Sequence, residues 1–201
     1  MENKILNFAY PGIVEDRDAA IRSVELNVFA RLAQDRIIFL SGEINETLAD
    51  TICAQLLFFE STSKKPVSLY INSGGGDVYS GLQICSVMDL LSVPVHTTIL
   101  GSACSMAAVI ASNGAKGYRQ ALPYSRFMIH QPLSSMGYSK FTDTKIALEE
   151  MESVRNDLYD ILAKNSGHSF DEIVNFCEHG DKWMKPQQAI ELGFIDSVVK
   201  K

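Results

Sequence analysis

The sequence contains no apolar stretch long enough to cross a membrane. Its longest mostly apolar runs, such as residues 54–59, fall far short of the roughly 20 residues that a membrane-spanning helix needs. Polar residues, Pro11 and Gly12 interrupt positions 1–14, which argues against a secretory leader. We therefore expect a soluble, cytoplasmic protein that does not associate with membranes.

The chain also lacks a cluster of basic residues. Its 18 lysines and arginines are outnumbered by 24 aspartates and glutamates, which gives a net charge of -6 and a pI near 5.2. No basic stripe is present that could bind a phosphate backbone, so nucleic acid is not expected as a partner.

Cysteines are few, and their spacing is not paired. All four lie in apolar segments, a pattern typical of buried free thiols in a reducing compartment rather than of disulfides or a zinc site. They are Cys53, Cys85, Cys104 and Cys177. We expect neither a metal ion nor an organic cofactor.

What the sequence does have is enough apolar content for one folded domain. With 201 residues and 46% hydrophobic content the chain can bury a core, and no linker or low-complexity tract divides it. Residues 1–25 carry little periodicity, which predicts an N-terminal arm. Residues 26–201 are then expected to form a single domain.

Extended and helical patterns alternate through the first half of this domain. Apolar extended stretches predict strands at residues 36–40, 66–72 and 94–100. Helical spacing of apolar residues predicts helices at 48–59 and 82–91. Short alternation of strand and helix is typical of a largely parallel sheet, so the predicted fold class is α/β.

The second half of the domain is expected to be richer in helix. Two further extended segments, at residues 118–122 and 127–130, precede a long helix over residues 142–164 with a continuous apolar seam. Ser169 and Glu172 form the sequence signature of a capping box, so another helix is expected to begin there.

One serine lies where chemistry is easiest to build. Residues 101–108 place Ser105 among small residues, between a predicted strand and a predicted helix over residues 106–112. A hydroxyl at such a junction stands clear of the backbone, and the first amides of the helix can face an oxyanion. A serine alone is a poor nucleophile, so it needs a base and a group that orients the base. Cys104 is a rival nucleophile, because only one of the two neighbours can face that base.

Four histidines are available as the base. His130 ends an apolar extended stretch, and catalytic side chains commonly emerge at such strand ends, although a histidine tucked into a sheet edge is the alternative. His96 lies inside a strand, whereas His168 and His179 border helix caps, where we expect them to be solvated. Asp181 follows a turn and precedes an apolar pair, so it could be held against the core as the orienting acid, but spacing alone does not select it.

A glycine run follows the second predicted strand. Residues 73–77, Ser-Gly-Gly-Gly-Asp, have neither the spaced glycines of a dinucleotide site nor the Lys-Ser/Thr of a phosphate-binding loop. Their amides could approach a ligand closely, which suits an oxyanion loop with a second donor from the amide of Met106. A tight turn is the alternative. Asp77 could cap the helix that follows.

Taken together, these segments resemble the ClpP family of serine peptidases, the proteolytic subunits of caseinolytic ATP-dependent proteases. The resemblance extends from about Val28 to Val199 and rests on several motifs in family order. These motifs are Arg36 to Leu40, Tyr70 to Ser73, Ala103 to Ala108, Met128 to Pro132, and Gly193 to Asp196. The implied fold is the ClpP/crotonase-like one with a projecting handle helix.

The resemblance implies a role for each candidate. Ser105 would be the nucleophile, His130 the general base and then acid, and Asp181 the orienting carboxylate. Gly76 and Met106 would donate the oxyanion-hole amides. The implied substrate-binding residues are Gly75, Pro132 and Leu133, and the implied unfoldase-docking residues are Tyr70 and Leu90.

The resemblance also implies an assembly of two stacked heptameric rings around a proteolytic chamber. A handle region of about residues 132–164 would join the rings, and residues 1–25 would form an axial loop at the pore. An AAA+ unfoldase of the Clp family would be the partner that delivers unfolded polypeptides. Entry into the chamber, rather than the active site, would then select the substrate.

Several positions depart from the family's pattern. Ser134 and Ser135 replace a common glycine pair, and residues 1–25 do not follow the usual axial-loop pattern. Gly74 stands where the family usually has proline, which predicts a looser oxyanion loop, and Gly180 stands where an arginine usually precedes the aspartate, which predicts fewer ion pairs between rings.

Gly180 and the unusual arm suggest a catalytically idle ring subunit that supports an active paralogue as one alternative. A crotonase-type acyl-CoA hydratase, in which glycine-rich loops also stabilise an oxyanion, is another. The presence of Ser105, His130 and Asp181 favours an active serine endopeptidase over both.

Overall fold

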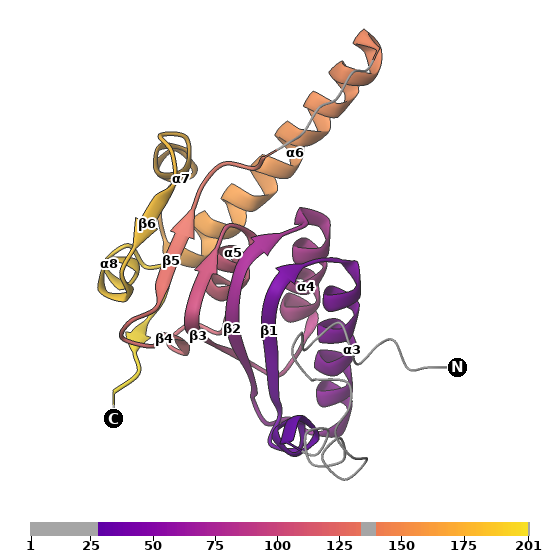
Figure 1. Ribbon diagram of the computed structural model, residues 1–201, viewed down its shortest axis with the longest axis vertical. Helices are drawn as coiled ribbons and strands as arrows, with labels where there is room; N and C mark the ends of the chain where they lie inside the picture. The colour runs from indigo at the N-terminus through magenta and orange to yellow at the C-terminus, as the bar shows by residue number, and fades with distance from the viewer. Residues whose placement is uncertain (1–27, 134–139, 201) are drawn as a thin grey trace, which may run out of the picture.

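The computed structural model describes residues 28–133 and 140–200, and it confirms the predicted α/β class (Figure 1). These residues form one seven-stranded sheet with helices packed against it. The predicted arm, residues 1–25, lies outside the described residues, as do positions 134–139 of the predicted handle region.

Strand and helix alternate through the first half of the domain, as predicted. After a helical segment at residues 28–34, the elements are β1 (Ile37–Ile44), α3 (Glu46–Thr62), β2 (Val67–Gly76), α4 (Val78–Leu90), β3 (Val95–Cys104) and α5 (Met106–Ser112). β1, β2 and β3 are parallel neighbours. Asp77 caps α4, because its carboxylate accepts the backbone N–H of Ser80 at 2.8 Å.

The second half supplies short strands and the long helix. Its elements are β4 (Arg119–Ala121), β5 (Arg126–Ile129), α6 (Phe141–Ser166), α7 (Phe170–Cys177), β6 (Lys182–Met184), α8 (Pro186–Glu191) and β7 (Ser197–Val198). The main path of the sheet runs β1-β2-β3-β4-β7, and β5 pairs with both β3 and β6. The β5–β6 pair is antiparallel. The capping box of Ser169 and Glu172 at the start of α7 is confirmed.

The glycine run differs from its prediction. The strand was expected to end at residue 72, but β2 continues through the glycines, with Gly75 opposite Glu43 and Gly76 opposite Ile44 of β1. Glycine has no side chain to collide with the neighbouring strands, so the run can stay in the sheet despite left-handed backbone at Gly75, where φ is 100°. The run is therefore the end of β2 and is paired with β1, whereas the pairing of β2 with β3 stops at Ser73, opposite Ala103.

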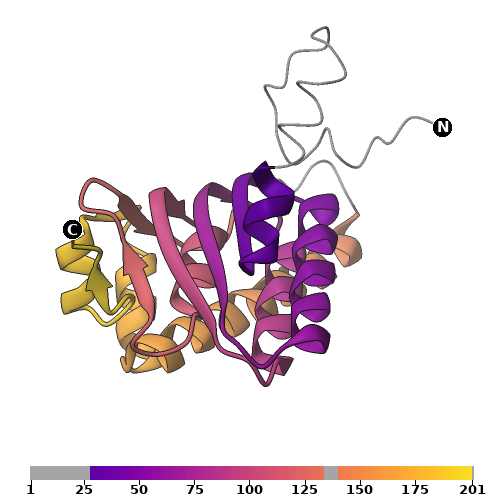
Figure 2. The same cartoon turned by 90° about the horizontal axis from the view of Figure 1, so that it is seen from below.

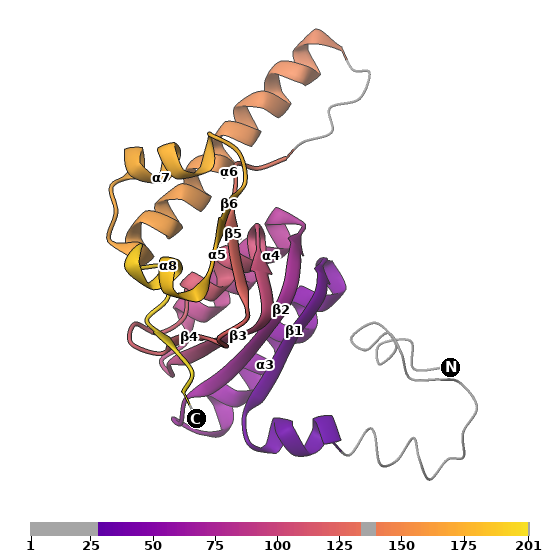
Figure 3. The same cartoon turned by 60° about the vertical axis from the view of Figure 1, so that its left-hand side comes forward.

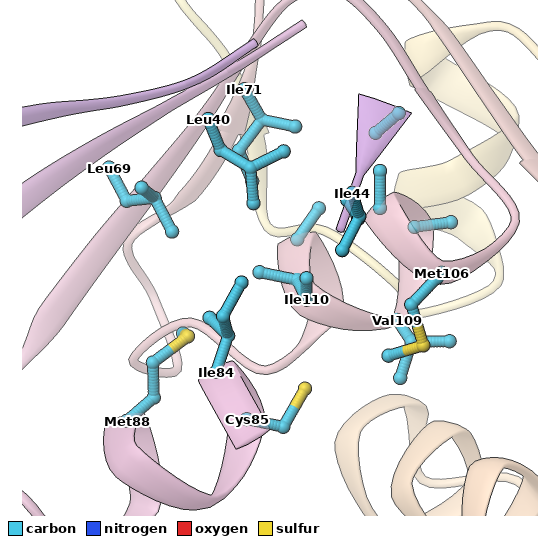
Figure 4. Packing of buried hydrophobic residues seen from close by; sticks show 14 of the residues in the cluster. Leu40, Ile44, Leu69, Ile71, Ile84, Cys85, Met88, Met106, Val109 and Ile110 are labelled. Atoms are coloured by element: carbon cyan, nitrogen blue, oxygen red, sulfur yellow. The ribbon is translucent and has the colours of Figure 1, made fainter. Parts of the chain in front are cut away.

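Helices α3 and α4 cover one face of the sheet (Figure 2). Side chains of β1 alternate accordingly: Ile38 and Leu40 are buried, whereas Ile37 and Phe39 are only half-buried. Figure 4 shows side chains of β1, β2, α4 and α5 meeting in one apolar core. On the opposite face, Phe39 stacks on Tyr70 of β2 with ring centroids 5.6 Å apart.

Helix α6 projects from the body of the molecule (Figures 1 and 3). Its C-terminal half packs through Val154, Leu158 and Leu162, all buried. Its N-terminal half carries exposed apolar side chains, namely Phe141, Ile146 and Leu148. The helix ends at Gly167, whose left-handed φ of 87° closes the last turn.

A buried ion pair connects the C-terminal ends of helices α5, α6 and α8. Arg119 on β4 is 1% exposed, and its guanidinium lies 2.6 Å from the carboxylate of Asp196. The same guanidinium donates to the backbone carbonyls of Ser112 in α5, Asn165 in α6 and Gly193 after α8. These bonds satisfy carbonyls that helix ends leave unpaired, so α5 is fixed at the end opposite Ser105.

Candidate active site

The candidate site lies at the carboxyl ends of β2, β3 and β5, the sheet edge from which α6 projects (Figure 1). Ser105, His130 and Asp181 all line one cavity of about 640 Å³. The other predicted residues that line it are Gly75, Gly76, Met106, Pro132 and Leu133. Segments from four parts of the chain are thus brought together around one space.

The backbone of Ser105 is the most unusual feature of the site. Ser105 has φ 55° and ψ -127°, a region that side-chain-bearing residues rarely occupy. Its N–H donates to the carbonyl of Met128 on β5 at 2.8 Å, and its own carbonyl accepts the N–H of Ala108 at 2.9 Å. The turn between β3 and α5 is therefore held from both sides. Strain of this kind, fixed by surrounding bonds, is typical of functional sites.

Gly75 lies directly against the turn that carries Ser105. A Cβ atom on Gly75 would come within 2.8 Å of the Cβ of Ser105 and of the carbonyl oxygen of Cys104, and within 3.2 Å of the Met106 nitrogen. No side chain fits there. The glycine run and the start of α5 consequently approach each other more closely than any other residue type would allow.

The hydrogen bonds of the glycine run leave one amide of special interest. The N–H of Gly75 donates to the hydroxyl of Ser73 at 3.1 Å, and the N–H of Asp77 donates to the carbonyl of Ile44 at 2.8 Å. Gly76 lies between these two engaged donors. The Gly76 amide is therefore the candidate oxyanion donor of this run.

His130 and Asp181 lie at the other wall of the cavity. The Nδ1 atom of His130 is 4.0 Å from a carboxylate oxygen of Asp181, and their side chains are 12% and 57% exposed. Asp181 is therefore not held against the core, contrary to the expectation from sequence. It precedes β6, whose side chains alternate: Met184 faces the core, whereas Trp183 is exposed, and Asp181 shares the exposed side.

The remaining histidines lie away from the cavity. His96 stacks on Tyr118, with ring centroids 4.1 Å apart, and burial lowers its pKa. His179 is exposed and contacts the carbonyl of Asn175. His168 was expected to be solvated, which is wrong: its side chain is only 22% exposed, because its ring packs on Phe176 and pairs with Glu172 at 3.3 Å.

Cys104 is poorly placed to act as the nucleophile. Cys104 is the last residue of β3, is 5% exposed and does not line the cavity. Burial raises the pKa of its thiol, which keeps it in the unreactive protonated form. All four cysteines are buried free thiols, as predicted.

One wall of the cavity was not foreseen from the sequence. Leu158, Tyr159 and Leu162 of α6 line it together with Val109 of α5. The spacing of Leu158 and Leu162 had marked them only as part of a helix seam. That spacing identifies the buried side of α6 but not which cavity the side would face.

Two predicted residues lie outside this cavity. Tyr70 is half-buried on the open face of the sheet, and Leu90, at the end of α4, is 74% exposed. In the part of the chain that the structure describes, no three histidine, cysteine or acidic side chains converge as metal ligands would. No helix within residues 28–133 and 140–200 is long and apolar enough to span a membrane.

Comparison with known proteins identifies the family of this chain. The sequence model of the Clp protease family matches residues 21–201. An ATP-dependent Clp protease proteolytic subunit from Bacteroides fragilis is 44% identical over 192 residues, which cover 95% of this chain and 91% of the relative. One from Streptococcus pneumoniae is 41% identical over 191 residues, 94% of this chain and 96% of the relative. The chain therefore belongs to the Clp protease family, a family of serine peptidases.

Proposed function

We propose that this chain is a serine endopeptidase that hydrolyses peptide bonds of unfolded polypeptides with Ser105, His130 and Asp181. The observation that carries the proposal is that these three side chains, from separate segments, line one cavity in which Ser105 has a strained backbone. Membership of a serine peptidase family supports the same assignment.

The proposed reaction has two halves. His130 takes the proton of the Ser105 hydroxyl as the Ser105 oxygen attacks the peptide carbonyl carbon. His130 then donates that proton to the leaving amine as the C–N bond breaks. Water then attacks the acyl-enzyme and gives a proton to His130. As the C–O bond to Ser105 breaks, His130 passes that proton to the Ser105 oxygen, which releases the acid and restores the free hydroxyl. Asp181 orients the imidazole and stabilises its protonated form.

The oxyanion formed in each half needs preorganised donors. We assign this role to the amides of Gly76 and Met106: the first lies between two engaged donors of the glycine run, and the second begins α5 beside Gly75. Gly75, Pro132 and Leu133 would bind the substrate backbone along the cavity. The apolar wall of Leu158 and Leu162 would accept an apolar substrate side chain.

The test is covalent labelling of the purified protein with a fluorophosphonate, followed by peptide mapping and a peptidase assay. We expect the label on Ser105, and we expect Ser105→Ala to lose labelling together with at least about 10³-fold of activity. Cys104→Ala is the matched control and should keep both. Retained activity in Ser105→Ala would refute the assignment, and an unlabelled wild-type protein would favour the idle ring subunit. Coenzyme A binding would instead favour the hydratase.

We also propose the family's assembly for this chain: two stacked heptameric rings, joined through α6, in the cytoplasm, with an AAA+ unfoldase that docks at Tyr70 and Leu90. The relatives are named as ATP-dependent, which supports an ATPase partner. The sheet face opposite α3 and α4 is only half-buried, and the projecting half of α6 carries exposed apolar residues such as Phe141 and Ile146. Both surfaces support contacts between subunits.

Sedimentation across a salt series tests the assembly. With Gly180 in place of an arginine, we expect a double ring that separates into heptamers readily but depends weakly on salt, because screening affects exposed charges far more than apolar burial. A double ring that separates steeply as salt rises would show that ion pairs dominate. A monomer under all conditions would refute the assembly.

A further inference from the structure

Two polar side chains lie directly behind the proposed site without contributing to the cavity. Asn72 and Ser73 are consecutive on β2, which runs between β1 and β3. Ser73 is 2% exposed, so its hydroxyl must be satisfied within the protein. Both residues occur where the sheet loses its regular register, and each one bonds a neighbouring segment of the site.

Ser73 connects the glycine run to β1. Its hydroxyl donates to the carbonyl of Gly42 at 2.5 Å and accepts the N–H of Gly75 at 3.1 Å. The β1–β2 pairing shifts register between Ser41 and Glu43, so Gly42 has no partner residue in the ladder. A single buried hydroxyl thus bridges Gly42 and Gly75 at the register shift and adds to the pairing of Gly75 with Glu43; Gly75 is the residue that lies against Ser105.

Asn72 supports the strand that leads to the nucleophile. Its amide oxygen accepts the N–H of Ser102 on β3 at 3.2 Å. The β2–β3 pairing shifts register between Ile71 and Ser73, next to this bond. A side chain on Gly101 would come within 2.5 Å of the same amide oxygen, so Asn72 fills the space beside the irregular part of β3. The bond lies three residues before Ser105.

We propose that Ser73 and Asn72 are positioning residues, which set the distance between the oxyanion loop and the Ser105 turn. Gly74 does not restrict the loop, because no atom lies within 4 Å of where its Cβ would be, so the loop is held by the Ser73 hydroxyl together with the pairing of Gly75 and Gly76 with β1. Ser73 acts through Gly75 on the Gly76 amide, and Asn72 acts through Ser102 on Ser105. The inference rests on the proposed function.

The proposal predicts a particular kinetic signature. An oxyanion exists in the transition state and not in the bound substrate, so a displaced donor lowers kcat and leaves KM nearly unchanged. Loss of a residue that only supports the fold would instead lower the fraction of active protein. Each remaining active site would still bind the transition state as much more tightly than the substrate as it does in wild type. Kinetics and affinity for a tetrahedral adduct separate the two roles.

The experiment compares Ser73→Ala with Ser125→Ala in the full chain. Ser125 is a matched control because its hydroxyl is also buried and donates to a backbone carbonyl, that of Leu122, but it does not line the cavity. We expect Ser73→Ala to lower kcat about 10- to 100-fold with KM within about twofold, and to weaken a peptide boronate, which becomes tetrahedral on Ser105, by a similar factor. Ser125→Ala should change neither.

Asn72→Ala provides a second variant that does not depend on a buried group. Asn72 is exposed, so the fold should tolerate the change, and we expect a smaller fall in kcat of about 3- to 10-fold with KM retained. The proposal is overturned if both variants keep wild-type kcat, or if kcat falls while boronate affinity does not. If Ser105→Ala is inactive but the Ser73 and Asn72 variants are normal, only this inference fails; an active Ser105→Ala refutes the proposed function itself.

Discussion

The two halves of the candidate site are built very differently. The half around Ser105, the proposed nucleophile, and the glycine run is fixed by bonds to β1, β2 and β5, and Gly75 lies directly against Ser105. In the half that would supply acid–base chemistry, His130 and Asp181 are 4.0 Å apart, and Asp181, just before the short strand β6, is 57% exposed.

This difference shows where a single chain can specify its own geometry. Atoms inside the sheet are packed between strands that allow only one arrangement of their neighbours. The distances between Ser105 and the glycine run are therefore set by the fold. Asp181 follows Gly180, whose φ is 100°, and has solvent on one side. Its distance from His130 therefore depends less on packing, and a change there should cost less than a change beside Ser105.

The largest effect is expected for Gly75→Ala. The added methyl group would overlap Ser105 and the Cys104 carbonyl, both backbone-anchored, and it would also require an alanine at φ 100°. We expect at least about 10³-fold loss of peptidase activity, equivalent to about 4 kcal/mol in the transition state. Fluorophosphonate labelling of Ser105 measures the loss, and native sedimentation checks that the protein still assembles. Activity within tenfold of wild type would mean that the two segments are not rigidly fixed.

The next effect concerns the anchor at the opposite end of α5. Asp196→Asn leaves the buried guanidinium of Arg119 without its countercharge, and we expect about 3 kcal/mol of stability to be lost. Urea unfolding, followed by fluorescence of the single tryptophan, Trp183, measures this loss. Asp160→Asn is a control, because Asp160 is an exposed carboxylate on α6.

The same variant has a defined pH dependence. Burial alone would raise the pKa of Asp196, but hydrogen bonds and the charge of Arg119, with a bond from the Gly117 amide, lower the pKa below its ordinary value of 3.8. A lowered pKa in the folded state stabilises the protein above the unfolded value, and this stability is lost as the pH falls through the folded pKa. Wild type should therefore lose more stability on acidification below about pH 4 than Asp196→Asn does. Parallel curves would contradict this origin of the stability.

At the acid–base half, Asp181→Asn should reduce activity by only about 10- to 100-fold, less than Gly75→Ala does. Solvent weakens the electrostatic interaction between an exposed carboxylate and an imidazole 4.0 Å away. A carboxylate in a buried triad typically contributes more to the rate. Turnover of a fluorogenic peptide at fixed pH measures the effect, and Asp171→Asn is an exposed control on α7. A loss larger than that of Gly75→Ala would invert the comparison and show that assembly tightens this half.

The sequence predicts the half of the site around Ser105 well and the half around His130 and Asp181 poorly, for physical reasons. The strand–serine–helix junction and the cap at Asp77 depend on neighbours in the chain, and both were found where the local pattern placed them. Strand pairing depends on distant residues, so the continuation of β2 through Gly76 was missed. The exposure of Asp181 and the apolar wall at Leu158 were missed as well, because both are decided by packing between distant segments.

The smallest effect should come from Gly74→Ala, the neighbour of the most sensitive position. Gly74 has no left-handed φ, and a Cβ there would meet no atom within 4 Å, so alanine fits without strain. Since alanine has less freedom than glycine in the unfolded chain, we expect a gain in stability of about 0.4–1 kcal/mol. Activity should stay within about twofold of wild type, because the Ser73 hydroxyl and the pairing with β1, not residue 74, hold Gly75 in place. Urea unfolding and kcat are measured on Gly74→Ala and Gly75→Ala side by side. Equal damage from the two alanines would mean that the whole glycine run needs glycine, and that contact with Ser105 does not explain the sensitivity of Gly75.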